Sequence, residues 1–213
     1  TSFIAWARQL IAPSIVRATS EAELFARILI TIGAVFVFAS ATLRTWAAAY
    51  LQTAIVHDSQ QHSEVLVADG PFRYTRNPLY LASLPMAAGI GVLASRAGFI
   101  FLVLANWIFL YRLIFREEKA LRQNQGESYR AYFEAVPRFW PALRPRVSAS
   151  GRSPRWAQAF AGESFVWIFG LAELSIAITL NPRVGLIAFV FAFFAYRLPL
   201  RLVQREHARR KAG

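Results

Sequence analysis

The sequence contains no cysteine. A disulfide framework, a thiolate nucleophile and a cysteine-ligated metal site are therefore all excluded. Histidine is also scarce, with three residues in 213. Two of them, His57 and His62, are spaced five residues apart, which is a poor spacing for one helix face, and no ligand cluster accompanies them. We therefore expect no metal site, and we interpret both histidines as solvated loop residues.

Acidic residues are few, with 12 Asp and Glu against 24 Lys and Arg, a net charge of +12. Taken alone, this surplus suits nucleic acid as readily as anionic lipid. Hydrophobic residues, however, make up 56% of the chain. A soluble protein this apolar would have to hide most of its surface, whereas a bilayer removes that need. The sequence predicts an integral membrane protein that does not bind nucleic acid.

Five apolar segments are candidates for membrane-spanning helices, which need about 20 mostly apolar residues each. Asn181-Pro182 is a turn signal between the last two, and Arg96 lies in the short turn between the second and third. Residues 1–17 predict an amphipathic helix in the membrane interface. The expected fold class is all-α, a multi-pass transmembrane helix bundle of about five spans with an N-terminal interfacial helix. The expected spans are Leu24–Leu43, Leu79–Leu93, Phe99–Phe115, Phe165–Leu180 and Val184–Tyr196.

Loop charges predict the orientation of these spans. Residues 116–157 hold nine Lys and Arg, and the tail from Arg197 holds six more, whereas two of the turns carry one Arg each. Because positive loops stay in the cytoplasm, residues 116–157, residues 45–77 and the C-terminus are expected inside and the N-terminus outside. All polar motifs of the chain then lie on the cytoplasmic side.

The stretch Arg144–Arg155, rich in Pro, Ser and Gly, reads as a linker. It predicts two units, a core of residues 1–146 and a C-terminal two-span hairpin with a basic tail of residues 147–213. The tail is expected to contact anionic lipid. In the fourth span, Glu173 lies near mid-membrane, where a charge needs a partner or a proton. Its candidate partners are Asn106, Arg183 and Arg197.

Two polar constellations flank the second and third spans. The first is Asp69-Gly70-Pro71-Phe72-Arg73-Tyr74-Thr75-Arg76-Asn77-Pro78-Leu79-Tyr80, in which Pro78 suits the first turn of a helix. Arg and Tyr are also typical of the membrane interface, so this segment by itself equally fits an anchor. The second begins with Arg116-Glu117-Glu118-Lys119, whose carboxylates are either solvated or positioned to accept hydrogen bonds from a ribose diol or to face a cation. It continues through Gly126-Glu127-Ser128-Tyr129-Arg130-Ala131-Tyr132 to Val136-Pro137-Arg138-Phe139-Trp140-Pro141.

In this order and spacing, the motifs resemble the isoprenylcysteine carboxyl methyltransferase family and its phospholipid methyltransferase relatives. The resemblance covers residues 65–141. It implies an integral membrane enzyme that moves a methyl group from S-adenosylmethionine to a lipophilic acceptor. Asn77-Pro78 is similar to the phospholipid branch, whereas Val136-Pro137-Arg138-Phe139 is similar to the carboxyl methyltransferase branch. The carboxylate of an isoprenylcysteine-like compound is the first expectation for the acceptor, and a phospholipid amine is the alternative.

The resemblance also implies roles for individual residues. Arg76 and Glu118 are the expected catalytic pair. Arg76 is expected to hold a carboxylate of the cofactor or of the acceptor, and Arg138 is a second candidate for that role. Gly89-Ile90-Gly91 is similar to a Gly-x-Gly assigned to the cofactor in the phospholipid branch, although glycines in membrane helices also permit close packing. The residues expected at the cofactor are Tyr74, Asn77, Tyr80, Gly89, Gly91, Glu117, Glu118 and Tyr129.

Two other classes of protein share some of these features. Membrane sterol reductases that use NADPH have a similar Arg-x-Pro-x-Tyr region, and their phosphate-binding pocket needs basic residues of the kind this chain has. A non-catalytic lipid-binding membrane protein is the second alternative. Binding of a methyl donor, of a nicotinamide cofactor or of neither distinguishes the three.

Overall fold

The computed structural model describes residues 2–11, 19–57, 68–191 and 193–194. Within these ranges the chain is helical and forms no β-strand, which confirms the all-α fold class. The histidine at position 62 and the basic tail lie outside the described residues. The helices are α1 (Phe3–Ile11), α2 (Thr19–His57), the 3₁₀ helix η1 (Gly70–Arg73), α3 (Pro78–Gly91), α4 (Arg96–Ala135), α5 (Trp156–Thr179) and a last helix, Pro182–Phe191.

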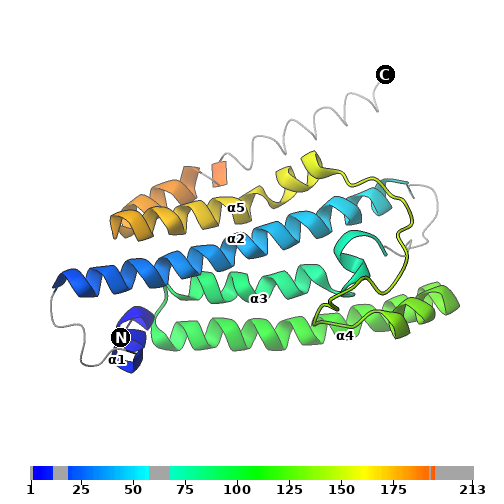
Figure 1. The fold of residues 1–213 in the computed structure, drawn as a ribbon, viewed down its shortest axis with the longest axis horizontal. Helices are drawn as coiled ribbons and strands as arrows, with labels where there is room; N and C mark the ends of the chain where they lie inside the picture. The colour runs from blue at the N-terminus through cyan, green and yellow to red at the C-terminus, as the bar shows by residue number, and fades with distance from the viewer. Residues whose placement is uncertain (1, 12–18, 58–67, 192, 195–213) are drawn as a thin grey trace, which may run out of the picture.

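The helices pack side by side in a row (Figure 1). α2 contacts both α3 and α5, and α4 packs on α3. Three helical segments are long and apolar enough to cross a membrane, Ser20–Leu51, Arg96–Gln123 and Trp156–Thr179. The 14 residues of α3 rise about 21 Å, less than the roughly 30 Å of a hydrocarbon core. The expected second span is therefore present as a short helix held between α2 and α4.

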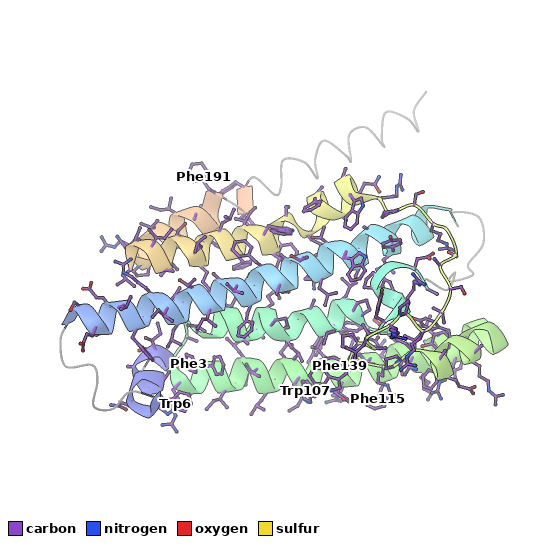
Figure 2. All side chains as sticks on the ribbon, viewed as in Figure 1. Phe3, Trp6, Trp107, Phe115, Phe139 and Phe191 are labelled. Atoms are coloured by element: carbon purple, nitrogen blue, oxygen red, sulfur yellow. The ribbon has the colours of Figure 1, made fainter. Side chains whose placement is uncertain are left out.

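Apolar side chains cover the outer surface of the bundle. On α4, Phe101, Ile108 and Phe109 are 71%, 59% and 62% exposed. Phe191 on the last helix likewise points away from its neighbours (Figure 2). A surface of this kind fits the apolar interior of a bilayer, because lipid tails cover such side chains at no cost.

Close packing of α2 against α3 depends on two glycines. A Cβ placed on Gly89 would lie 2.5 Å from the carbonyl oxygen of Gly33 and 2.7 Å from a methyl group of Val37. Membrane helices approach this closely only where small residues face each other. α2 buries further small residues along its length, including Ala34, Ala41 and Ala49.

The N-terminal helix α1 packs at the turn between α3 and α4. The ring of Phe3 stacks on Phe99 with 4.1 Å between ring centroids, and the guanidinium of Arg96 lies 5.2 Å from the centre of a Trp6 ring. This end of the bundle is opposite the end that carries η1 (Figures 1 and 2). The expected amphipathic helix is confirmed for residues 3–11, and residues 12–18 lie outside the described ranges.

Residues 136–155, here called the strap, run from the end of α4 across η1 to the start of α5. The N–H of Ala142 donates to Tyr74 O and the N–H of Arg146 to Arg73 O, both at 2.9 Å. Ser150 donates through its N–H to Asp69 Oδ1 at 2.8 Å. The stretch that reads as a linker is thus bonded to η1, because its backbone donors find acceptors there. The division of the chain into two units stays a prediction.

Glu173 has a different environment from the one expected. Its side chain is buried on α5, and neither carboxylate oxygen has a hydrogen-bond partner among the described residues. The predicted pairing with Asn106 or Arg183 is therefore wrong, and Arg197 lies outside the described ranges. Asn106 is on α4, which packs on α3 rather than α5, and Arg183 lies on the last helix, after the turn at Leu180 that ends α5. Gly33 leaves room for the carboxylate, since a Cβ there would lie 2.3 Å from Glu173 Oε1.

Candidate active site

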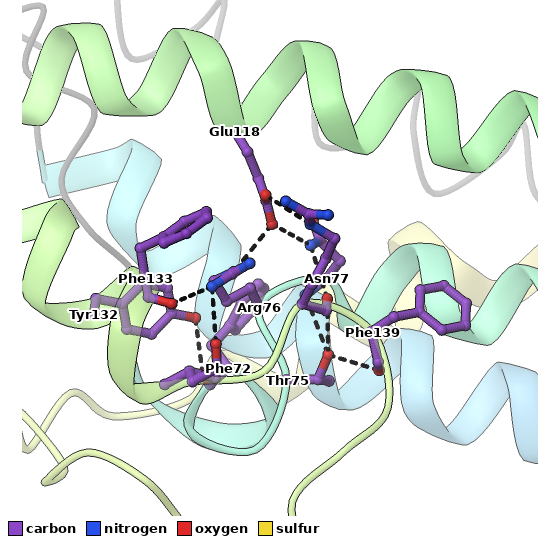
Figure 3. Close-up of polar contacts among 10 residues, drawn as sticks. Phe72, Thr75, Arg76, Asn77, Glu118, Tyr132, Phe133 and Phe139 are labelled. Atoms are coloured by element: carbon purple, nitrogen blue, oxygen red, sulfur yellow. Dashed lines mark hydrogen bonds and ion pairs between the residues drawn. The ribbon is translucent and has the colours of Figure 1, made fainter.

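The carboxylate of Glu118 binds residues of both polar constellations of the sequence. Arg76 Nε donates to Glu118 Oε1 at 3.0 Å, and Arg138 Nε donates to Oε2 at 2.9 Å. Asn77 Nδ2 donates to Oε1 at 3.1 Å and also to the backbone oxygen of Arg138 at 2.9 Å. Figure 3 shows Glu118 reaching from α4 onto Arg76 and Asn77, which stand between η1 and α3.

Local backbone structure brings these residues together. Asn77 precedes Pro78, the first residue of α3, where a missing N–H costs nothing. Gly70 begins η1 at φ +55°, a conformation that favours glycine, and the ring of Tyr50 fills the space where a Cβ would stand. The strap is tied to the same turn, because Arg76 N–H donates to Pro137 O at 2.9 Å and Thr75 Oγ1 donates to Phe139 O at 2.9 Å.

The charged groups of this network are largely withdrawn from water. The side chains of Glu118 and Arg76 are 5% and 7% exposed, whereas Arg138 is 32% exposed. A buried carboxylate needs several donors to replace its hydration, and Glu118 has three. Removing one partner of such a pair leaves a buried charge without compensation, which typically costs about 3–5 kcal/mol.

Arg76 is held on several sides. Its Nη1 donates to the backbone oxygens of Phe133 and, at 3.0 Å, of Val136. Its guanidinium carbon also lies 3.7 Å from the centre of the Phe133 ring. Because most of its donors are engaged by the protein, Arg76 fixes the position of Glu118 and of the end of α4. Arg138, which is more exposed, presents more of its guanidinium to a ligand.

Tyrosines line the interior side of the network. Tyr129 is 2% exposed, and burial raises its pKa to about 12; the nearby Glu118 carboxylate acts in the same direction, while Arg76, Arg122 and Arg138 act against it. Burial also raises the pKa of Tyr132 well above its usual range, and the Tyr132 hydroxyl donates to Phe72 O at 2.8 Å. Both phenols therefore stay neutral at physiological pH.

Two further expected residues lie at the edge of this arrangement. The hydroxyl of Tyr80 donates to Glu117 Oε1, so this carboxylate lies beside the first turn of α3. Tyr74 packs against Trp46 of α2 with 6.1 Å between ring centroids, and its backbone oxygen holds the strap. Both flank the network without bonding to Glu118.

A pocket of about 460 Å³ opens beside Arg76. Its walls combine the cationic groups of Arg76 and Arg146 with the aromatic rings of Phe133 and Trp140. Such a mixture suits a ligand with an anionic group and a flat ring. The remaining lining residues are Glu134, Ala135, Val136, Pro137 and Ala142.

Gly89 and Gly91 are not brought to this network. Gly89 lies twelve residues along α3 from Asn77, about 18 Å at helical rise, and faces Gly33 of α2. A Cβ on Gly91 would lie 2.8 Å from the ring of Phe99. The structure accounts for both glycines through helix packing.

Two residues of the site carry no role in the sequence-based assignment. Phe133 stacks on Arg76, and the guanidinium carbon of Arg122 lies 3.5 Å from the centre of the same ring. The position of Arg122 four residues after Glu118 was the available signal, since residues at that spacing share a helix face. In the described part of the chain, no three His, Asp or Glu side chains group together as metal ligands.

Comparisons with known proteins bear on the same region. The family model of phospholipid methyltransferase matches residues 22–128, half of the chain. The cobalt-zinc-cadmium resistance protein CzcN of Cupriavidus metallidurans is 24% identical over 116 residues, 54% of this chain and 50% of that protein. The chain thus spans about half the length of this curated relative. No solved structure matches.

Proposed function

Because the chain belongs to the phospholipid methyltransferase family, we propose that it moves a methyl group from S-adenosylmethionine to a lipophilic acceptor at the membrane surface. Membership of the family indicates methyl transfer by a membrane protein. One observation supports the proposed methyl donor and methyl acceptor. It is the network of Arg76, Asn77, Glu118 and Arg138 beside the pocket at one end of the bundle. Loop charges support a cytoplasmic location for this end, where S-adenosylmethionine is available.

The residues that line the pocket fit S-adenosylmethionine. Arg76 and Arg146 suit its carboxylate, and the rings of Phe133 and Trp140 suit its adenine. Glu117 and Glu118 do not line this pocket, and we assign them as acceptors for a ribose diol or an amino group, with Tyr74, Tyr80 and Tyr129 around them. When bound, S-adenosylmethionine supplies an electrophilic methyl group together with its own leaving group.

The task left to the protein is positioning and electrostatics. Arg76 and Asn77 hold Glu118 in place, and burial excludes water from the carboxylate. Arg138, the most exposed member of the network, orients the acceptor. The acceptor enters sideways between helices, because its tail has no reason to leave the bilayer.

An acceptor carboxylate fits this site better than an amine. A carboxylate is already a nucleophile and needs a cation to orient it, which Arg138 provides. An amine must first lose a proton, and the guanidinium groups repel its protonated form. A phospholipid amine remains the alternative acceptor, favoured by the description of the family and by Asn77-Pro78.

Methyl transfer to two acceptors across pH tests the proposal. Purified protein is supplied with radiolabelled S-adenosylmethionine and either N-acetyl-farnesylcysteine or phosphatidylethanolamine vesicles. A base-labile methyl ester whose formation persists below about pH 6 supports a carboxylate acceptor, since that group stays ionised there. A base-stable N-methyl lipid as the only product, formed less at acid pH, establishes the amine instead. Absence of methyl transfer together with NADPH binding points to the reductase class.

A further inference from the structure

Arg122 lies next to the polar network and has no role in the function proposed above. It lies one helical turn after Glu118 on α4, so both side chains leave the same face of the helix. Its guanidinium carbon lies 3.5 Å from the centre of the Phe133 ring, and that of Arg76 lies 3.7 Å from the same point. Two groups this near to one ring centre occupy its opposite faces. Phe133 is therefore held between two cations, of which Figure 3 shows Arg76.

The two guanidinium groups differ in whether their N–H donors have hydrogen-bond partners. The edge of Arg76 is engaged by Glu118 and by the backbone oxygens of Phe133 and Val136. Arg122 makes no hydrogen bond or ion pair with any described residue, and its side chain is exposed. A stacked guanidinium uses its face on the ring and keeps its in-plane donors free. The edge of Arg122 is thus open to a ligand.

Charge around the network is not balanced. Three guanidinium groups, those of Arg76, Arg122 and Arg138, act on the buried Tyr129, against one carboxylate, Glu118. Among the neighbouring carboxylates whose side chains the structure describes, Glu117 accepts from Tyr80 and Glu134 pairs with Arg130. A surplus of cations with free in-plane donors favours a carboxylate or a phosphate, which a guanidinium binds through two parallel hydrogen bonds.

We propose that Arg122 binds the anionic headgroup, a carboxylate or a phosphate, of the membrane-anchored acceptor. This inference rests on the proposed function and adds a specificity-determining residue to it. Arg122 and the more exposed Arg138 recognise the acceptor, while Arg76 and Arg146 serve the pocket of the methyl donor. A neutral molecule of the same shape binds more weakly because it leaves the edge of Arg122 without a partner.

Binding of matched acid and neutral ligands to the full chain in detergent tests the assignment. One pair is N-acetyl-farnesylcysteine and its methyl ester, and the other is lysophosphatidic acid and monoacylglycerol of the same chain length. The wild-type protein should prefer the acid of at least one pair by about ten-fold, the value of one charge-assisted contact. Arg122→Gln should lower that preference several-fold, with Arg138 as the remaining cationic contact, and leave the affinity of the neutral ligand unchanged. The pair that shows the effect identifies a carboxylate or a phosphate as the recognised group.

Two variants and a second ligand control this test. Arg116→Gln removes the same charge from an exposed position on another face of α4 and should keep the acid preference. Arg122→Lys keeps the charge without the planar fork and should give an intermediate preference. S-adenosylhomocysteine should bind Arg122→Gln as it binds wild type, which shows an intact fold.

An unchanged acid preference in Arg122→Gln overturns the assignment, as does a wild-type protein without any preference. An acid preference in a wild-type chain that fails to bind S-adenosylhomocysteine contradicts the proposed function and leaves the role of Arg122 standing.

Discussion

Glu118 is the residue on which the site depends, because it accepts hydrogen bonds from groups of three other residues. This arrangement alters how a substitution at position 118 is to be interpreted. Removing the side chain leaves the buried guanidinium of Arg76 without a counter-charge, so Glu118→Ala affects folding as well as activity. The near-isosteric Glu118→Gln keeps the shape and removes the charge.

We predict that Glu118→Gln lowers methyl transfer by about ten-fold to a hundred-fold, because charge-assisted contacts of about 1.5–3 kcal/mol weaken to neutral ones. The rate of methyl transfer at saturating S-adenosylmethionine checks this prediction, and the melting temperature in detergent shows whether the variant is folded. Arg116→Gln, a charge change on another face of α4, is the matched control and should keep wild-type activity. Full activity in Glu118→Gln would show that the network is an interfacial anchor.

The buried tyrosines give the stability of the protein a dependence on alkaline pH. Burial raises the pKa of Tyr129 to about 12, whereas an unfolded tyrosine titrates near 10. Below about pH 10 the phenol is protonated in both states and contributes no pH dependence. Between these two values the unfolded state loses a proton that the folded state keeps, so stability falls as pH rises.

We therefore expect the melting temperature to fall between about pH 10 and pH 12, and to fall less steeply in Tyr129→Phe, which has no phenol to ionise. Thermal unfolding in detergent across this range measures both slopes. Tyr111→Phe changes a phenol of the apolar part of α4 and serves as the comparison. Equal slopes in wild type and Tyr129→Phe would show that Tyr129 titrates normally.

At the scale of helices, α3 links the site to the rest of the bundle. Asn77, the residue before its first turn, joins the network, and the last turns of α3 pack on α2 through Gly89. The same glycine is both a predicted cofactor contact and an observed packing contact. Substitution by alanine distinguishes these roles.

Gly89→Ala places a methyl group against the backbone oxygen of Gly33, which cannot move without shifting α2. We predict a loss of about 1–3 kcal/mol in the free energy of unfolding, as for other overpacked contacts. Gly33→Ala should cost less, because its new methyl group meets first the end of the flexible Glu173 side chain. A Gly89→Ala protein with unchanged melting temperature and lost S-adenosylhomocysteine binding would instead assign Gly89 to the cofactor.

The sequence predicts the parts of this structure that depend on local pattern. Apolar runs indicate the helices, and the spacing of the motifs identifies Arg76, Asn77, Glu118 and Arg138, which the structure joins. Contacts between distant segments are beyond such patterns. Nothing in the composition of the strap shows that Asp69 and the backbone of η1 bind it, and nothing in α3 shows which face of Gly89 meets α2. The same reason explains why Phe133 and Arg122 have no predicted role and why the expected partners of Glu173 are wrong.

For the whole molecule, loop charge predicts which end of the bundle faces the cytoplasm. Ser148 in the strap and Ala97 at the start of α4 are both exposed. The strap and the start of α4 lie at opposite ends of the bundle (Figure 1). The absence of cysteine allows a single cysteine to be placed at each position. An impermeant thiol reagent outside the cell should label Ala97→Cys and leave Ser148→Cys unlabelled. The reverse pattern would place the site outside the cell.

Titration of the purified protein with S-adenosylhomocysteine shows whether the site binds the product of a methyl donor, and it needs no knowledge of the acceptor. We predict saturable binding by wild type and by Arg116→Gln, and an affinity at least about ten-fold lower for Glu118→Gln. Calorimetry with NADPH under the same conditions should give no binding. Saturable binding of NADPH by a folded wild-type protein that does not bind S-adenosylhomocysteine would overturn the assignment as a methyltransferase.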